Sequence, residues 1–199
     1  MVCSCNHTST SKKARIGKGT KVYPFVYIGD NVVIGKNCKI YPHAVIYNNV
    51  KIGDNCIVGN HASVREWCVI GNNTQIGQKV GVECCTNIGN NVSIESQSHI
   101  TGWMTIEDCV FVGGFIGSTN DMKMSWKRKG HGENLRGATL KYGCRIGSGS
   151  LLLPAVVIGK HSIVNAGEIV RKDIPDNTLF FTKKGKPIFK KIKEDKLRV

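Results

Sequence analysis

A histidine in the middle of the chain is the best candidate for proton transfer. His99 comes directly before Ile100, and a neutral imidazole accepts a proton near neutral pH. Aliphatic residues recur every six positions here, and three such steps place His99 level with Gly117. Asn120 and Asp121 follow Gly117 closely, so we expect them beside His99. The spacing therefore predicts a polar site with His99 as its general base.

A repeat of six residues would position these side chains. Every sixth residue from Ile16 to Val112 is Ile or Val, and the spacing resumes from Leu140 to Val170. This period matches neither the 3.6 residues of a helical turn nor the two-residue alternation of a strand. It fits short buried β segments of Ile and Val joined by corners of Gly and Asn. Three segments close a triangular coil, and successive coils pair as parallel strands about 4.8 Å apart.

The repeat is interrupted once. Val112 and Leu140 are separated by 28 positions, which is not a multiple of six, so residues are inserted between them. We expect an N-terminal tail over 1–13, an all-β parallel helix over 14–170 with an inserted loop over 113–139, and a short basic extension over 171–199. A loop longer than about 15 residues in a compact repeat is usually functional.

Positive charge gathers in the inserted loop and the C-terminal extension. The net charge is +14, which indicates a polyanionic or phosphorylated partner. The basic residues of the two segments are Lys123, Lys127, Arg128, Lys129, Arg136, Arg171, Lys172, Lys183, Lys184, Lys186, Lys190, Lys191, Lys193, Lys196 and Arg198. Both segments adjoin the last coils, so we expect one electropositive groove. A solvated basic surface is the alternative.

The nine cysteines are interpreted as packing residues and free thiols. Cys38, Cys56, Cys68 and Cys144 occupy the small inward position of the repeat, where a thiol packs as an apolar group. Cys84, Cys85 and Cys109 fall on outward positions, and nothing near them favours a thiolate nucleophile. The histidines lack the spacing of a zinc site, so no metal is predicted.

The composition also favours a cytoplasmic protein. The first residues, MVCSCNHTSTSKK, contain no apolar run, so we expect no secretory signal. No stretch approaches the roughly 18 apolar residues of a membrane span. Unpaired cysteines fit a reducing compartment.

The hexapeptide pattern resembles that of the hexapeptide-repeat acyltransferases, which fold as left-handed parallel β-helices. Three stretches carry a closer resemblance: MTIEDCVFVGGFIGSTND, LRGATLKYGCRIGSGSLLLPAVVIGKHSIVNAGEIVRKDIPDNTLF and KKGKPIFKKI. They are similar to acetyl-CoA-dependent N-acetyltransferases that act on nucleotide-linked amino sugars. Asn165 and Glu168 depart from the Gly and the small residue that are usual in that group.

This resemblance implies transfer of an acetyl group from acetyl-CoA to the amine of a nucleotide-linked amino-deoxy sugar. The pantetheine arm would lie along the final coils at Ser148, Ala166 and Gly167, with the phosphates near Lys183, Lys184 and Lys186. Asn120, Asp121 and Gln97 would orient the acceptor amine, and His99 would take its proton. The group also implies a homotrimer with active sites between subunits.

Two other functions remain open. O-acetylation of a saccharide needs a stronger base, typically a His–Asp or His–Glu pair, and no such pair is close in sequence around His99. A non-enzymatic β-helix could instead bind polyanions through its basic loop and tail. We expect no nucleic-acid partner, because the chain carries no nucleic-acid module signature and few aromatic residues among its basic clusters.

Overall fold

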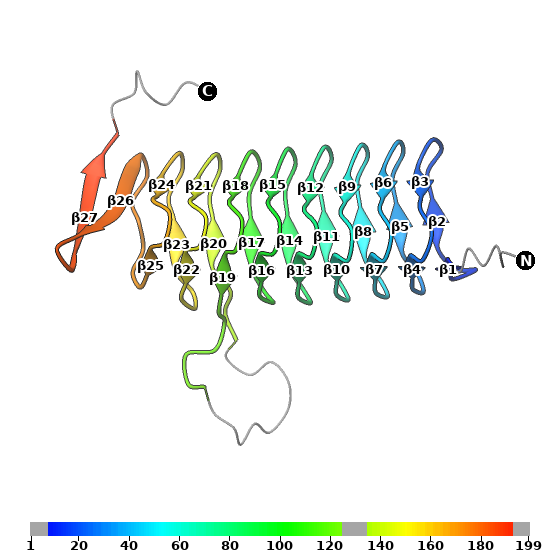
Figure 1. Ribbon diagram of the computed structural model, residues 1–199, viewed down its shortest axis with the longest axis horizontal. Helices are drawn as coiled ribbons and strands as arrows, with labels where there is room; N and C mark the ends of the chain where they lie inside the picture. The colour runs from blue at the N-terminus through cyan, green and yellow to red at the C-terminus, as the bar shows by residue number, and fades with distance from the viewer. Residues whose placement is uncertain (1–7, 125–134, 193–199) are drawn as a thin grey trace, which may run out of the picture.

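The computed structural model describes residues 8–124 and 135–192, and all regular structure in these segments is β. The chain winds through short strands that stack coil upon coil, and it ends in a hairpin at the far end from the N-terminus (Figure 1). Before the insertion, strands pair in parallel with partners eighteen residues on, as in Val45↔Ser63 and Ser63↔Gly81. Across the insertion the paired strands are farther apart in the sequence, as in Thr105↔Thr139. The predicted parallel β-helix is confirmed.

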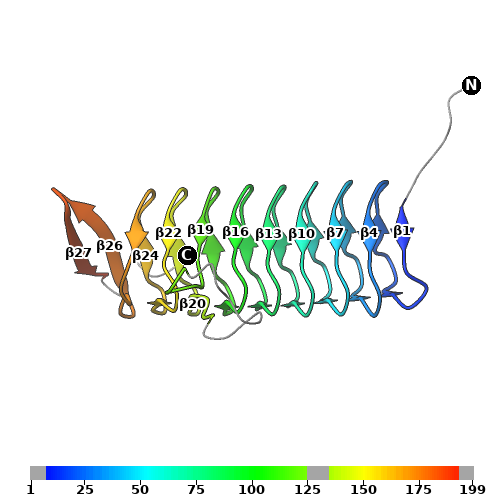
Figure 2. The same ribbon diagram turned by 90° about the horizontal axis from the view of Figure 1, so that it is seen from below.

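Three faces run along the helix. The first contains β1 (Ser9–Thr10), β4 (Tyr27–Ile28), β7 (Val45–Ile46), β10 (Ser63–Val64), β13 (Gly81–Val82) and β16 (His99–Ile100), and it continues into β19 (Gly117–Ser118), β22 (Leu151–Leu152) and β25 (Ile169–Val170). The His99 N–H donates to the Ile116 carbonyl at 2.8 Å and joins the two parts. Figure 2 shows β16, β19 and β22 in one row.

The other two faces are continuous sheets. The second contains β2 (Arg15–Ile16), β5 (Val33–Ile34), β8 (Lys51–Ile52), β11 (Val69–Ile70), β14 (Asn87–Ile88), β17 (Thr105–Ile106), β20 (Thr139–Leu140) and β23 (Val157–Ile158). The third contains β3 (Lys21–Val22), β6 (Lys39–Ile40), β9 (Ile57–Val58), β12 (Gln75–Ile76), β15 (Ser93–Ile94), β18 (Phe111–Val112), β21 (Arg145–Ile146), β24 (Ile163–Val164), β26 (Thr178–Lys183) and β27 (Lys186–Lys191).

The aliphatic repeat forms the core. From Ile28 onward its residues are buried along the axis, while Ile16 at the open N-terminal end is 39% exposed. Cys38, Cys56, Cys68 and Cys144 are buried beside them, as predicted. Each buried aliphatic side chain contributes about 1.5–3 kcal/mol to folding.

The corners correct one expectation about glycine. Non-glycine residues adopt positive φ at every sixth position from Phe25 to Phe115, often as Asn, whose side chain tolerates this conformation. Most glycines that follow the aliphatic position do not need positive φ. A Cβ on Gly71 would lie 2.6 Å from the carbonyl carbon of Gly89 in the next coil. Close approach of coils therefore selects glycine at this position.

The inserted loop is shorter than predicted. The coil continues through β19, whose Gly117 and Ser118 pair with Leu151 and Leu152, so the predicted start at 113 is too early. Ser118 is buried at the aliphatic position, where its hydroxyl donates to the His99 carbonyl and accepts from the Thr101 N–H, both at 2.8 Å. The Arg136 N–H donates to the Asn120 carbonyl at 2.9 Å and closes the base of the loop.

The C-terminal extension is an ordered hairpin rather than a tail alone. β26 pairs in parallel with β24 and antiparallel with β27, with Lys183↔Lys186 at its tip. Lys184 and Gly185 make the turn with φ of 49° and 74°. The helix also extends beyond 14–170, because β1 pairs with β4 and Ile174 bridges Ile158.

Candidate active site

Two pockets lie along the last coils of the first face, one beside the hairpin and one beside the start of the inserted loop. The hairpin pocket, of about 540 Å³, is lined by Gly167, Glu168, Ile169, Arg171, Lys172, Phe180, Thr182, Gly185, Pro187 and Phe189. The loop pocket, of about 830 Å³, is lined by Thr101, Ser118, Thr119, Asn120, Asp121, Met122, Met124, Leu151, Leu153, Pro154 and Arg171. Arg171 lines both, so the two pockets are neighbours that share this residue. We refer to them together as the cleft.

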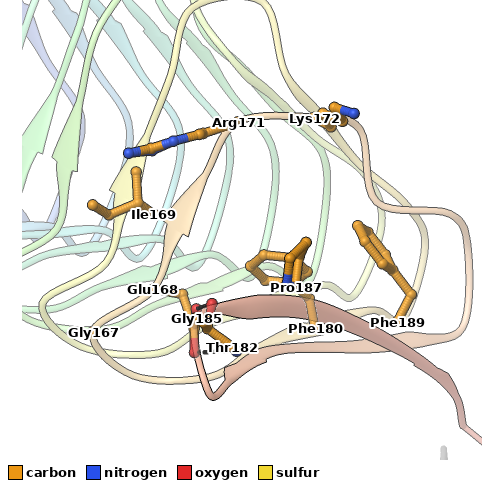
Figure 3. Close-up of a pocket in the computed structure, with 10 residues that line it drawn as sticks. All are labelled: Gly167, Glu168, Ile169, Arg171, Lys172, Phe180, Thr182, Gly185, Pro187 and Phe189. Atoms are coloured by element: carbon orange, nitrogen blue, oxygen red, sulfur yellow. Dashed lines mark hydrogen bonds between the residues drawn. The ribbon is translucent and has the colours of Figure 1, made fainter.

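The hairpin pocket lies between the last coil and β26–β27 (Figure 3). Glu168 fixes the distance between these walls, because its Oε1 accepts from the Thr182 N–H at 2.8 Å and its Oε2 from the Thr182 hydroxyl at 2.6 Å. Phe180 and Phe189, with ring centroids 5.1 Å apart, supply apolar surface. Arg171 and Lys172 supply positive charge at the opposite wall.

Of the predicted coenzyme residues, Gly167 lines the hairpin pocket, and the others are neighbours of its lining residues. Gly167 lines it, and the Gly167 N–H donates to the Ser148 carbonyl at 2.9 Å. Ala166, next to Gly167, is exposed. Lys183, Lys184 and Lys186 form the hairpin tip around Gly185, which is a lining residue. Exposed backbone and three lysines thus adjoin one pocket.

The predicted acceptor residues Asn120 and Asp121 both line the loop pocket. Asn120 Nδ2 donates to the Gly102 carbonyl at 3.3 Å. Asp121 Oδ1 accepts from the N–H groups of Lys123 and Met124 at 2.9 and 3.1 Å, which shapes the first turn of the loop. Asp121 therefore has a structural role in the loop while it faces the pocket.

His99 is oriented differently from the expectation. Its side chain is 54% exposed, and its Nε2 lies 3.8 Å from Glu83 Oε1 in the preceding coil. Among the described residues that line the cleft, neither His99 nor Gln97 occurs, although Thr101 on the same strand path does. The imidazole leans over Gly81, whose missing side chain leaves room for it, and Gln97 lies at a corner with φ of 62°. The structure brings Asn120 and Asp121 together but not His99 with them.

The charged groups around His99 form a small network. Arg65 Nη1 lies 3.8 Å from Glu83 Oε2, and Arg65 Nε donates to Glu66 Oε2 at 3.0 Å. The guanidinium also lies 5.1 Å from the centre of the Tyr47 ring. Glu83 therefore faces both a guanidinium and the imidazole, a spatial pair that residue spacing did not reveal.

The sequence placed Arg171 only in the general basic cluster of the extension, and it did not single out Glu168 or Thr182 as parts of a site. Arg171 does carry a usable signal, because it follows the aliphatic position of its coil as Thr101, Thr119 and Leu153 follow theirs. All four residues line the loop pocket. Thr182 carries none, because the hexapeptide spacing ends before the hairpin.

Two buried cysteines are unsuited to nucleophilic chemistry. Burial raises the pKa of the Cys68 and Cys144 thiols to about 12, so they stay protonated. Across 8–124 and 135–192, no group of three or more His, Cys, Asp or Glu side chains could hold a metal ion, and no helix could cross a membrane. Lys127, Arg128, Lys129, Lys193, Lys196 and Arg198 lie outside the described residues.

Comparison with known proteins first defines the class. The structure superimposes on the UDP-N-acetylglucosamine acyltransferase from Bacteroides fragilis 9343 with a TM-score of 0.76 and 22% identity, over 96% of this chain and 74% of that one. This shows that the β-helix is the left-handed type of the hexapeptide-repeat proteins. Residues 5–106 match the family model described as the GMPPB C-terminal domain, and the chain belongs to that family.

Two curated proteins match shorter stretches. A Schizosaccharomyces pombe protein named only by its class, acetyltransferase, is 51% identical over 45 residues, which are 23% of this chain and 22% of that protein. The galactoside O-acetyltransferase of Lactococcus lactis is 53% identical over 36 residues, 18% of this chain and 17% of that enzyme. The chain therefore matches less than a quarter of the length of either relative.

Proposed function

We propose that this protein is a CoA-dependent acyltransferase that moves an acetyl group from acetyl-CoA to the amine of a nucleotide-linked amino-deoxy sugar. The observation that carries this proposal is the cleft itself, in which Arg171 joins a pocket edged by lysines to a pocket lined by Asn120 and Asp121. The short matches to proteins named as acetyltransferases support the reaction class.

The donor would occupy the hairpin pocket. The pantetheine arm needs backbone groups that it can approach, and Gly167, Ala166 and Ser148 are all exposed. The CoA phosphates would lie near Lys183, Lys184 and Lys186, since ammonium groups bind phosphate strongly. The thioester would then point past Arg171 toward the loop pocket.

The acceptor amine would attack the thioester carbonyl. The C–N bond forms, the C–S bond breaks, and CoA leaves as a thiolate that takes up a proton. Asn120 and Asp121 would orient the amine, with Gln97 at the margin of the site. His99 would accept the amine proton after turning from Glu83 toward Gly117, which lies beside it in the next coil and presents no side chain.

O-acetylation of a saccharide is the second candidate. It is favoured by the pairing of His99 Nε2 with Glu83 Oε1 at 3.8 Å, because a nearby carboxylate stabilises the imidazolium formed when a hydroxyl is deprotonated. The match to a galactoside O-acetyltransferase points the same way.

A homotrimer in the cytoplasm completes the proposal. Met122 and Met124, at the start of the inserted loop, are 70% and 83% exposed, and a neighbouring copy would bury part of this apolar surface. Size-exclusion chromatography coupled to light scattering is expected to give three times the mass of one chain. A monomeric mass would contradict the proposed trimer, but it would not contradict the proposed substrate binding in the cleft.

A substrate panel tests the function. Acetyl-CoA is supplied with nucleotide-linked 3-amino and 4-amino deoxyhexoses, or with the matched hydroxy sugars and galactosides, and thiol release is recorded. We expect release with an amino sugar. Release with hydroxy sugars alone selects the second candidate, and acetyl-CoA that neither binds nor reacts contradicts both.

A further inference from the structure

The loop pocket is larger and more apolar than an acetyl group and an amine require. Its volume is about 830 Å³. Five of its lining residues are apolar: Met122, Met124, Leu151, Leu153 and Pro154. An acetyl group offers them one methyl. The acceptor sugar would meet the polar wall of the same pocket, at Thr119, Asn120 and Asp121, which leaves the apolar wall for another group.

An apolar strip leads into the loop pocket from the hairpin pocket. Ile169 lines the hairpin pocket and Leu151 lines the loop pocket, and the two residues pair in register between β25 and β22. Paired residues on adjacent strands lie about 4.8 Å apart. The Leu151 side chain leans over Gly117, since its Cδ1 would lie 3.0 Å from a Cβ placed there.

A second column runs beside this strip. Leu153 and Arg171 occupy equivalent positions in successive coils, and the Leu153 N–H donates to the Val170 carbonyl at 3.1 Å. Arg171 stands at the boundary between the pockets, and Leu153 and Pro154 lie beyond it. An acyl chain that enters past Arg171 thus meets Leu151, Leu153 and Pro154 before it reaches Thr119 in the next coil.

We propose that the loop pocket binds an acyl chain longer than acetyl, carried on the CoA thioester and laid over Leu151 toward Leu153 and Pro154. The inference rests on the proposed function for the CoA site. The thioester carbonyl stays near Arg171, the C–S bond breaks as the acceptor nitrogen or oxygen bonds to that carbonyl, and the acceptor proton reaches the departing thiolate. Met122 and Met124 supply a flexible wall that adapts to chain length.

A chain-length series tests this proposal. Acetyl-, propionyl-, butyryl- and hexanoyl-CoA are compared by kcat/KM, and the matching S-alkyl-CoA thioethers, which cannot react, are compared by Kd. Burial of one methylene changes an equilibrium constant by about fourfold. We expect the Kd to fall by about that factor per methylene up to hexanoyl, with kcat/KM rising in parallel.

A narrowed pocket supplies the matched control. Leu151→Phe fills the strip and is expected to remove the gain in Kd beyond propionyl, measured relative to the acetyl-length compound in the same variant. Val157→Phe enlarges a half-buried residue of β23 that lines neither pocket, and it should preserve the gain. If Leu151→Phe does not fold, Leu151→Met changes the same wall with little change in volume.

The possible outcomes distinguish failure of the acyl-chain proposal from failure of the proposed CoA-dependent function. If acetyl-CoA is turned over but Kd and kcat/KM worsen with each methylene, the acyl-chain proposal is wrong and the acetyltransferase stands. If Leu151→Phe and Val157→Phe lose the chain-length dependence of Kd equally, the acyl chain does not lie over Leu151 and the proposal is overturned. If no CoA compound binds, both proposals fail together.

Discussion

Glu168 and Thr182 join the last coil to the C-terminal hairpin through two hydrogen bonds, of 2.8 and 2.6 Å, to one carboxylate. The pair forms one wall of the hairpin pocket, and Gly167 and the lysine tip lie on either side of it. Glu168 stands where the resembling enzymes carry a small residue. A carboxylate in a cationic region thus holds the pocket together, because both its oxygens are engaged by the hairpin.

Loss of this carboxylate should loosen the hairpin without unfolding the helix. Glu168→Ala removes two charge-assisted bonds at an exposed site, where about 1 kcal/mol is at stake. Amide hydrogen exchange in β26 and β27 should accelerate several-fold while exchange in β12 and β15 stays unchanged. Thr182→Ser keeps both donors and serves as the matched control. Unchanged hairpin exchange in Glu168→Ala would show that strand pairing with β24 suffices.

Arg171 should affect both substrates, because it lines both pockets. Arg171→Ala is expected to raise KM for acyl-CoA and for the acceptor, each by about tenfold, since a charge-assisted hydrogen bond contributes about 1.5–3 kcal/mol. Lys172→Ala removes a charge from the hairpin pocket alone and should raise only the acyl-CoA KM. An unchanged acceptor KM in Arg171→Ala would show that Arg171 does not contact the acceptor, which would contradict its proposed place between the two substrates.

The pairing of His99 with Glu83 leads to a prediction about turnover. His99→Asn should lower kcat by about 10²–10⁴ and leave KM nearly unchanged, the usual loss when a general base is removed. Glu83→Gln should lower kcat less with a hydroxyl acceptor, and scarcely at all with an amine that is partly neutral at pH 8. Steady-state kinetics with both acceptors measure the difference. Unchanged turnover in His99→Asn removes the base assignment but not acyl transfer.

The fold was readable from the sequence because its stabilising contacts repeat locally. An aliphatic residue every six positions must face one axis, so the three-sided helix and the buried cysteines follow without knowledge of distant contacts. Ser118 interrupts the aliphatic repeat in the sequence, but the coil continues through it in the structure. Its buried hydroxyl is hydrogen-bonded to the His99 carbonyl and the Thr101 N–H. Those partners belong to the preceding coil, which the spacing alone does not reveal.

The site was less predictable than the fold, because its contacts join residues that do not follow the six-residue repeat. Asn120 and Asp121 follow the last regular strand before the loop, so coil counting places them near the last coils. Glu168 acquires its role from Thr182, which lies beyond the repeat and packs by strand pairing. His99 Nε2 lies 3.8 Å from Glu83 Oε1 in the preceding coil, a contact between side chains that the hexapeptide spacing does not predict.

Two glycines test why the repeat selects this residue. A Cβ on Gly71 would lie 2.6–2.8 Å from three backbone atoms of the next coil, whereas a Cβ on Gly81 meets only side-chain atoms at 3.6 and 3.8 Å. Gly71→Ala should destabilise the protein by about 1–3 kcal/mol. Gly81→Ala should be neutral or slightly stabilising. Thermal unfolding of the two variants measures this, and equal melting temperatures would contradict the close-approach explanation.

Thiol reactivity should follow burial. The pKa of Cys68 and Cys144 is raised to about 12 by burial, so their thiolate fraction at pH 8 is about 10⁻⁴. Cys109 is exposed. Iodoacetamide at pH 8 should label Cys109 rapidly and leave Cys68 and Cys144 unlabelled until the protein unfolds. Early labelling of Cys68 in the folded state would contradict its place in the core.

A structure of the protein with bound CoA tests the central claim most directly. The predicted result is a CoA molecule with its phosphates at Lys183, Lys184 and Lys186, its pantetheine arm beside Gly167, and its sulfur at Arg171, the residue that the two pockets share. CoA bound at another surface, or an empty cleft at saturating CoA, would contradict the account.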